Sequence, residues 1–401
     1  MSDTALKHVE YLTNTIGPRG STTPEEKKAH EYCKAALEQL GYEARWEEYY
    51  SAMSGWHPFA LALGLMTLAV IIYYFTGRSL NASMGALAAS IIAVIAAGSF
   101  FLQLLKYDNP LRWFLPVARS QNVWAVARPT GAVKKRVVVT GHVDTHRTAL
   151  AMQSVGLWRL FQVLTNLAGV VLLALLALFV YGIFNSGLLL RDIALYVSAV
   201  LAAGLVFTLQ PDFTPYVKGG NDNATGAAAV LALAERLKRE PLANTEVFLV
   251  NTGCEEVHHY GMADWIRRHA RADAPGASYL VLDNIGGKNS DLNYVIEETL
   301  MFPQKSDAGL IQIAEAVAKE NADLPAKPFV FRGLDSELST CVHYGQKALG
   351  LLNFDPKTKM PPYFHTARDD FDNVDPELLD KSERFAWAIM QKIDSDHELA
   401  L

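Results

Sequence analysis

Four long stretches of the sequence contain no charged residue, and they restrict the fold more than any other feature. They run from His57 to Phe75, from Ser79 to Leu105, from Leu160 to Leu190 and from Ile193 to Gln210. About 20 mostly apolar residues span a bilayer, whereas core helices of soluble domains rarely extend so far without charge. We therefore predict transmembrane helices near 58–76, 82–105, 160–184 and 190–209. Buried helices of a soluble domain are the alternative, and it is weaker for the second and third stretches.

The predicted spans form two hairpins, because a short polar loop joins the members of each pair. A hairpin returns the chain to the side that it left. Residues 1–56, 106–158 and 210–401 are therefore expected on one side of the membrane. We predict that they form one domain, interrupted by hairpin one at 57–105 and hairpin two at 159–209.

The flanking charges predict the side. The flanks of the predicted domain carry Lys106, Arg112, Arg119, Arg147 and Arg159, whereas the hairpin tips carry Arg78 and Arg191. Lys and Arg are enriched in cytoplasmic loops, so a multi-pass protein in the lipid bilayer with a cytoplasmic domain is expected. The first 56 residues lack the early apolar core of a signal peptide. Glycosylation-type triplets at Asn81 and Asn223 point weakly the other way.

Composition excludes several classes of protein. Apolar residues make up 50% of the 401 residues, so a disordered chain is excluded. Three cysteines, Cys33, Cys254 and Cys341, are too few for a disulfide scaffold and fit a reducing compartment. A net charge of -6 argues against a nucleic-acid partner, since such proteins usually present a basic face.

Outside the apolar stretches, predicted strands alternate with predicted helices. Helices are expected at 23–40, 224–240, 260–271, 308–320 and from Pro376, and strands at 42–50, 121–127, 136–142, 245–251, 278–283, 327–331 and 348–354. In the first helix Thr23 suits the cap and Glu26 completes a capping box. Such alternation predicts an α/β fold with a mixed central sheet and helices on both faces.

Residues suited to binding metal follow the predicted strands. They are His142 and Asp144 in GHVD, Asp222 in NDNATG, Glu255 and Glu256 in CEE, Asp283 in VLDN, and His365 in FHT. Ligand sites of such sheets gather where strands end and loops begin. Imidazole and carboxylate together bind Zn²⁺ and similar ions.

Taken singly, each of these residues has an ordinary structural explanation. Asp222 before a helix is usually an N-cap, and a Glu-Glu pair usually lies on the surface. His258 and His259 are assigned to the surface or to the surroundings of a site, and Cys254 to packing. His146 is a candidate for lining the pocket. We expect a carboxylate of the acidic run after His365 to orient that ring.

In their order, these five motifs resemble the co-catalytic di-zinc peptidases of metallopeptidase family twenty-eight. That family includes bacterial aminopeptidases and glutamate carboxypeptidase II, with the glutaminyl cyclases as relatives. The resemblance covers all the predicted soluble segments and implies a zinc-exopeptidase fold. This chain would be a membrane-embedded variant.

The resemblance implies a role for each matched residue. One zinc ion would be held by His142 and Asp283 and the other by Glu256 and His365, and Asp222 would bridge the two. Two Zn²⁺ per chain are expected, with Co²⁺ or Mn²⁺ as alternatives.

Two further roles are catalytic. Glu255 would be the general base that takes a proton from water, and Asp144 would hold the second ring nitrogen of His142. Two features depart from the family pattern. The interval between His142 and Asp222 spans 80 positions and contains hairpin two. Some relatives also have Tyr before the last His, where this chain has Phe364, so the oxyanion donor stays open.

The favoured function is a membrane-bound zinc exopeptidase with a peptide substrate, in the first place an aminopeptidase. One alternative is a single-zinc acyltransferase similar to glutaminyl cyclases. The other is a non-enzymatic membrane receptor or scaffold, which would be expected to have lost ligands. The sequence leaves the oligomeric state open.

Overall fold

The computed structural model describes residues 2–77, 81–185, 187–300 and 302–396. The chain forms two compact units. The sheet unit contains Met1–Met53, Ala118–Thr148 and Pro215–Leu401, and the helical unit contains Ser54–Val117 and Ala149–Thr214. The helical unit therefore includes residues 54–56, 106–117, 149–158 and 210–214, which the sequence analysis assigns to the soluble domain.

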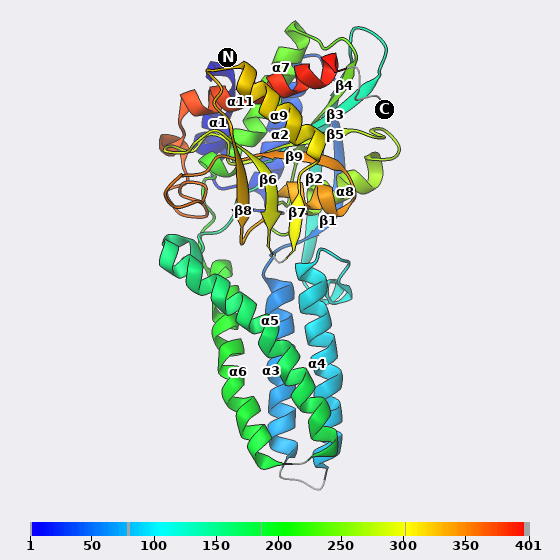
Figure 1. Cartoon of the computed structure of the whole chain (residues 1–401), viewed down its shortest axis with the longest axis vertical. Coiled ribbons are helices and arrows are strands. Elements are labelled where there is room, and N and C mark those ends of the chain that lie inside the picture. Colours follow the sequence, from blue (N-terminus) through cyan, green and yellow to red (C-terminus); the bar gives the residue numbers. More distant parts are fainter. Residues whose placement is uncertain (1, 78–80, 186, 301, 397–401) are drawn as a thin grey trace. The chain divides into compact units, whose positions relative to one another are not determined.

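The sheet unit is built on one mixed sheet (Figure 1). Its strands are β1 (Arg45–Ala52), β2 (Val117–Ala127), β3 (Lys135–His142), β4 (Thr245–Thr252), β5 (Ser278–Leu282), β6 (Asn293–Thr299), β7 (Pro303–Lys305), β8 (Lys327–Arg332) and β9 (Lys347–Leu351). Their order is β1-β2-β4-β3-β5-β9-β6-β7, and β8 pairs with β6. The central strands β4, β3, β5 and β9 are mutually parallel, so their carboxyl ends lie at one edge.

Helices cover both faces of this sheet. They are α1 (Ser2–Glu10), α2 (Pro24–Gln39), α7 (Thr225–Arg239), α8 (Tyr260–His269), α9 (Ala308–Glu320), α10 (Glu337–His343) and α11 (Pro376–Ser395). One core cluster joins alternate strand residues to α1, α2, α7, α9 and α11, and another joins the remaining strand residues to α8 and α10. The predicted mixed sheet with helices on both faces is confirmed.

Strong local signals located most elements within a few residues. At α2, Thr23 accepts a hydrogen bond from the Glu26 amide, and the Glu26 carboxylate accepts one from the Thr22 amide, as in a capping box. The sequence analysis missed α1, β6, β7 and α10. β7 and α10 are short, with 3 and 7 residues, and β6 is fixed by its pairing with β7, β8 and β9, so tertiary contacts outweigh local propensity there.

Both segments of the helical unit are inserted at points where the sheet unit turns back on itself. The first lies between the neighbouring strands β1 and β2, where Arg119 stacks 5.7 Å from the Tyr50 ring. The second lies between Thr148, whose amide donates to the carbonyl of Pro215 at 2.9 Å, and Pro215 itself. Arg147 forms an antiparallel bridge with Tyr216. Each insertion therefore leaves and re-enters the sheet unit at adjacent points.

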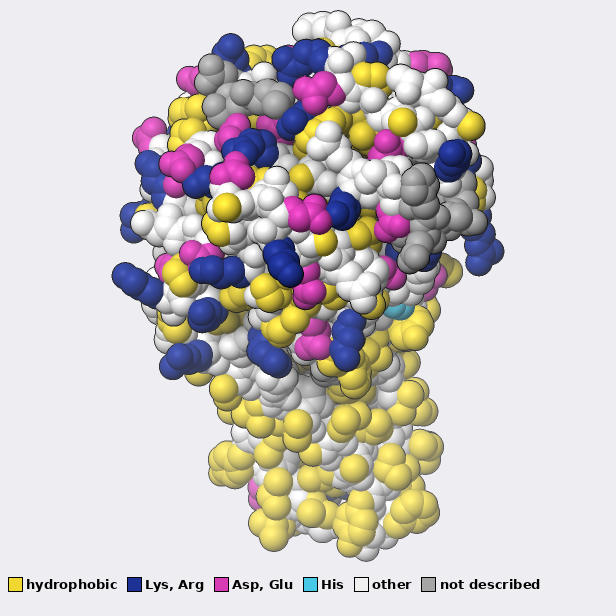
Figure 2. Space-filling model, turned by 45° about the horizontal axis from the view of Figure 1, so that its top comes forward, with side chains coloured by type: hydrophobic (Ala, Val, Ile, Leu, Met, Phe, Trp, Pro, Cys, Tyr) yellow, Lys and Arg dark blue, Asp and Glu magenta, His cyan; other side chains and the backbone are white. Residues whose placement is uncertain are grey.

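The helical unit consists mainly of α3 (His57–Thr76), α4 (Ala82–Leu104), α5 (Val155–Phe184) and α6 (Leu188–Leu209). Helix α3 packs on α4 and α6, and α5 packs on the same two helices. All four are long and apolar enough to cross a membrane. Figure 2 shows hydrophobic side chains gathered over these helices. Exposed apolar residues of the four helices include Ile71, Ile91, Val170 and Leu189. Membrane insertion agrees with this surface and stays a prediction.

The structure describes only one of the two arginines predicted at the hairpin tips. Arg78 lies outside the described residues. Arg191 is buried: it donates hydrogen bonds to the carbonyls of Tyr73 and Ala82, and its guanidinium lies 4.3 Å from the Tyr73 ring. The carbonyl end of a helix favours a cation, so Arg191 stabilises the end of α3.

We predict that the sheet unit folds without the helical unit. The variant to test replaces each of the segments 54–117 and 149–214 with an Asn-Gly turn. The residues that flank each segment already lie side by side in the sheet unit, and Asn-Gly favours tight hairpins. A soluble protein with one cooperative thermal transition by circular dichroism is expected. Aggregation, or loss of the transition, would contradict the hairpin interpretation.

Candidate metal centre

The predicted ligands gather at the edge where the parallel strands end. His142 is the last residue of β3, and Asp283 directly follows β5. Glu255 and Glu256 lie in the turn between β4 and α8, and Asp222 lies in the kinked segment before α7. His365 comes from the loop before α11. Segments that are distant in the sequence therefore meet because their strands are neighbours.

Two groups of side chains share Asp222. His142 Nε2 lies 3.4 Å from Asp222 Oδ1 and 3.6 Å from Asp283 Oδ1. His365 Nε2 lies 3.1 Å from Asp222 Oδ2 and 3.2 Å from Glu256 Oε2. The two oxygens of Asp222 thus face different imidazoles. This arrangement suits two cations with one bridging carboxylate.

The chemistry of these donors fits metal ions. The five side chains are between 2% and 9% exposed. His142 Nε2, Asp222 Oδ2 and Glu256 Oε1 are buried and lack a hydrogen-bond partner among the described residues. Several buried carboxylates face few imidazoles, and such an excess of negative charge requires compensation. Bound cations would supply it.

The pKa values reflect this crowding. Burial raises the pKa of Glu255 and of Glu256 well above the usual range, although His142 and His365 oppose the shift. Burial alone would lower the pKa of His365, but Glu256 and Asp222 outweigh it and raise the pKa to about 10. The imidazoles thus compensate part of the negative charge of the carboxylates, as a bound cation would.

Asp144 lies beneath these ligands and organises two of their loops. Its Oδ1 lies 3.5 Å from His142 Nδ1, on the side of the ring away from the cluster. Its carboxylate accepts hydrogen bonds from the amides of Glu255 and Glu256, at 3.1 and 3.2 Å, and from the Ser21 hydroxyl at 2.6 Å. His142 Nδ1 lies closer, at 3.1 Å, to the backbone carbonyl oxygen of Asp144, so the predicted pairing with the carboxylate is the longer of the two contacts. The bonds to the Glu pair were not anticipated.

The segment around Asp222 is held by residues that the sequence analysis missed. Asp369 accepts hydrogen bonds from the amides of Asn221 and Asp222, at 2.7 and 3.1 Å. Gly219 has a φ of 60°, and a Cβ there would lie 2.3 Å from the Asp222 carbonyl oxygen. Glycine is therefore needed for this close turn.

Arg19 is the second missed residue, and it joins the two ends of the 80-position interval. It is fully buried, and its guanidinium donates hydrogen bonds to the carbonyls of Val143, Lys218 and Gly219 at 2.7, 2.7 and 3.0 Å. Burial lowers the pKa of Arg19 to about 10, which leaves it charged at neutral pH. No local sequence signal distinguishes this arginine.

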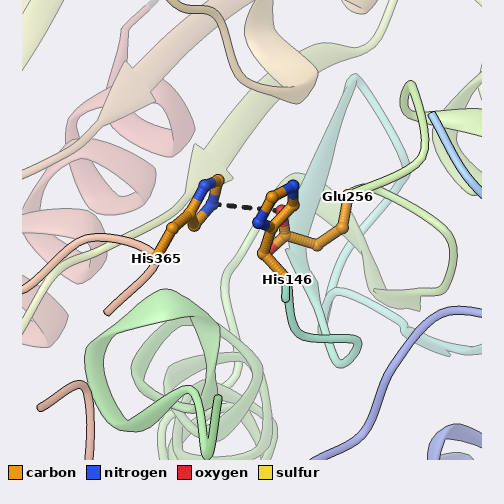
Figure 3. A group of neighbouring side chains, drawn as sticks. All are labelled: His146, Glu256 and His365. Carbon is orange, nitrogen blue, oxygen red and sulfur yellow. Dashed lines mark ion pairs between the residues drawn. The ribbon is translucent and has the colours of Figure 1, made fainter. Parts of the chain in front are cut away.

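Rings stack on His365, whereas the expected orienting carboxylate of the acidic run that follows it is not in contact with the free ring nitrogen. Phe364 stacks on it at 3.8 Å between centroids, and His146 stacks on it at 3.8 Å with planes 11° apart. Figure 3 shows the rings of His146 and His365 beside Glu256. Nδ1 of His365 has no hydrogen-bond partner among the described residues. The acidic run instead supplies Asp369 to the Asp222 segment, because the chain turns away after His365.

His146 also belongs to a group that could hold an ion, together with Glu256 and His365. Its Nδ1 lies 2.5 Å from the Arg147 carbonyl oxygen. The parallel stacking directs the His146 ring across the face of His365. This geometry indicates a supporting ring more than a ligand.

Comparisons with known proteins find one matching family model and several similar solved structures. Residues 205–390 match the model of peptidase family M28. Similar solved structures include a glutaminyl cyclase from Tannerella forsythia (12% identity, 98% of each chain covered, TM-score 0.58). They also include a leucine aminopeptidase precursor from Bacteroides thetaiotaomicron (15%, 98% of this chain and 97% of that chain, 0.56) and a zinc aminopeptidase from Bacillus subtilis (14%, 100% and 96%, 0.58). No curated protein matches the sequence.

At these identities the solved structures show a shared fold. The family match includes Asp222, the Glu pair, Asp283 and His365 and begins after His142, inside the last part of the second insertion. The resemblance seen in the motifs is confirmed. Residues 205–390 therefore carry the sequence pattern of peptidase family M28.

Proposed function

We propose that the chain is a membrane-bound, zinc-dependent exopeptidase that acts as an aminopeptidase. The observation that supports this most strongly is the pair of side-chain groups that share Asp222. His142 and Asp283 would hold one ion, Glu256 and His365 the other, and Asp222 both. Zinc bound there would polarise a peptide carbonyl and lower the pKa of water.

Glu255 is the proposed general base. Its Oε2 lies 3.9 Å from His142 Nε2, beside the first group of ligands, and its Oε1 faces away toward His259. Burial favours the uptake of a proton by this carboxylate. Glu255 would accept the proton of the attacking water and deliver it to the leaving amine. Asp144 would keep both His142 and the Glu pair in position.

The membrane part of the proposal rests on the helical unit. Helices α3 to α6 have the length and composition of spans, and they expose apolar side chains around the bundle. We propose a multi-pass protein in the lipid bilayer, with the sheet unit on the cytoplasmic side as the Lys and Arg bias indicates.

A glutaminyl-cyclase-like acyltransferase is the second candidate, since glutaminyl cyclases are among the similar solved structures. The complete set of donors for two ions favours hydrolysis over cyclisation by a single ion. The same set disfavours a receptor or scaffold that has lost its ligands.

Glu255→Gln should abolish peptide hydrolysis while the protein keeps its metal. The amide cannot accept a proton, and general bases contribute about 10²–10⁴-fold to rates. Turnover of aminoacyl fluorogenic substrates gives the rate, and elemental analysis gives the zinc content. The exposed Glu43→Gln serves as a matched control with wild-type turnover. Retained turnover in Glu255→Gln would refute this role.

The substrate class follows from a second comparison. An aminopeptidase should release the first residue of a free peptide and spare its N-acetylated form, because it acts beside a free amine. Mass spectrometry of paired peptides, including one with N-terminal Gln, distinguishes the outcomes. Ring closure of that Gln without peptide cleavage would favour the cyclase, and cleavage of acetylated peptides from the carboxyl end would exclude an aminopeptidase.

A further inference from the structure

A histidine that the sequence analysis assigned to the surroundings of the site contacts the proposed general base. His259 is 5% exposed, and its Nε2 lies 3.2 Å from Glu255 Oε1. On the other side of the ring, Nδ1 lies 2.9 Å from the Thr340 hydroxyl oxygen. Thr340 lies on α10 and is also buried. The three side chains form a continuous line that ends at Glu255.

We propose that His259 is a positioning residue for Glu255, which holds Oε1 so that Oε2 is directed toward the metal centre. The inference rests on the proposed role of Glu255. It assigns a defined task to each carboxylate oxygen, because Oε2 is the one near His142.

Hydrogen-bond chemistry fixes the direction of this line. A carboxylate only accepts, so Nε2 of His259 carries the proton and donates it to Glu255. In the neutral ring Nδ1 is then an acceptor, and the Thr340 hydroxyl donates to it. Thr340 therefore selects the tautomer of His259, as the partner of the other ring nitrogen commonly does.

The backbone of the turn brings the ring to this place. His258 and His259 have φ values of 101° and 56°, in the region that favours glycine. The amide of His259 donates to the Glu255 carbonyl at 2.7 Å, which closes the turn. Conformations of this kind cost of order 1–3 kcal/mol each and persist where the surrounding structure requires them. Here the result is an imidazole directed at Glu255.

The positioning also explains how Glu255 can work while buried. A carboxylate that is free to rotate would present either oxygen to the water and to His142. With Oε1 held by an N–H donor, the transferred proton can be accepted only on Oε2. His259 keeps its own proton throughout, so it does not enter the reaction as an acid or base.

The test uses the full-length, zinc-loaded chain and pairs each loss of a polar atom with a conservative variant. His259→Leu removes the donor, whereas His259→Gln retains an N–H. Thr340→Val removes the hydroxyl, and Thr340→Ser keeps it. His343→Leu, the same change at the last residue of α10, is the control with wild-type activity. Steady-state kinetics, zinc content and thermal unfolding are measured for each.

We expect His259→Leu to lower kcat by about 10- to 100-fold, the effect of a hydrogen bond to a charged group, with KM and zinc content nearly unchanged. His259→Gln should recover part of the loss. Thr340→Val should lower kcat by less, Thr340→Ser by less again, and Thr340→Val should add nothing to His259→Leu. If the Leu variant fails to fold, His259→Gln with the Thr340 pair carries the test.

Three results would overturn the inference. In the first, the wild type hydrolyses peptides, Glu255→Gln does not, and a folded His259→Leu has a normal kcat. This result would refute the positioning role of His259 and leave the proposed role of Glu255 intact. If the wild type hydrolyses no peptide, the proposed function fails and this inference fails with it. A fall in zinc content in parallel with kcat would mean that His259 supports the ligands and not the base.

Discussion

The candidate centre depends on hydrogen bonds that bring together two segments 80 positions apart. Arg19 bonds to the carbonyl of Val143 on one side and to those of Lys218 and Gly219 on the other. The short ladder formed by Thr148 and Pro215 closes the same gap. A buried carbonyl left without a donor costs about 1–3 kcal/mol, so this arrangement is strongly specified. It allows His142 and Asp222 to meet although the chain leaves the sheet unit between them.

This closure explains how a peptidase fold accommodates long apolar insertions. Both inserted segments replace connections between chain segments that are already neighbours, so neither disturbs the sheet register. Surface connections of this type tolerate long insertions at small entropic cost. The family match begins at residue 205, inside the second insertion, so His142 lies outside the matched stretch.

The predictable features were those with a local cause. The carboxyl ends of parallel strands meet at one edge of the sheet, so motifs that follow such strands located all five proposed ligands. Capping signals and hydrophobic periodicity likewise located α2, α7 and α11. Arg19 and Asp369 were missed because their partners are remote in sequence. His259 was assigned only to the surface or to the surroundings of the site, because its contact with Glu255 depends on an unusual turn. His365 illustrates the same limit: carboxylates follow it closely in the chain, yet stacked rings orient it.

Around the candidate centre, one set of side chains is suited to binding metal and another set holds those side chains in place. Asp144 holds His142 and the Glu pair, Asp369 holds the Asp222 segment, and His259 contacts Glu255. Such supporting contacts fix the geometry of metal ligands and catalytic groups. The effect of a substitution at one of these supporting residues should therefore depend on which ligand or catalytic group loses its contact.

The central claim is that side chains from both sides of the second insertion surround a pair of cations. Anomalous diffraction recorded above and below the zinc edge on crystals of the zinc-loaded protein tests it most directly. Two peaks are expected, one between His142 and Asp283 and one between Glu256 and His365, with Asp222 between the peaks. A single peak, or zinc bound away from Asp222, would contradict the claim.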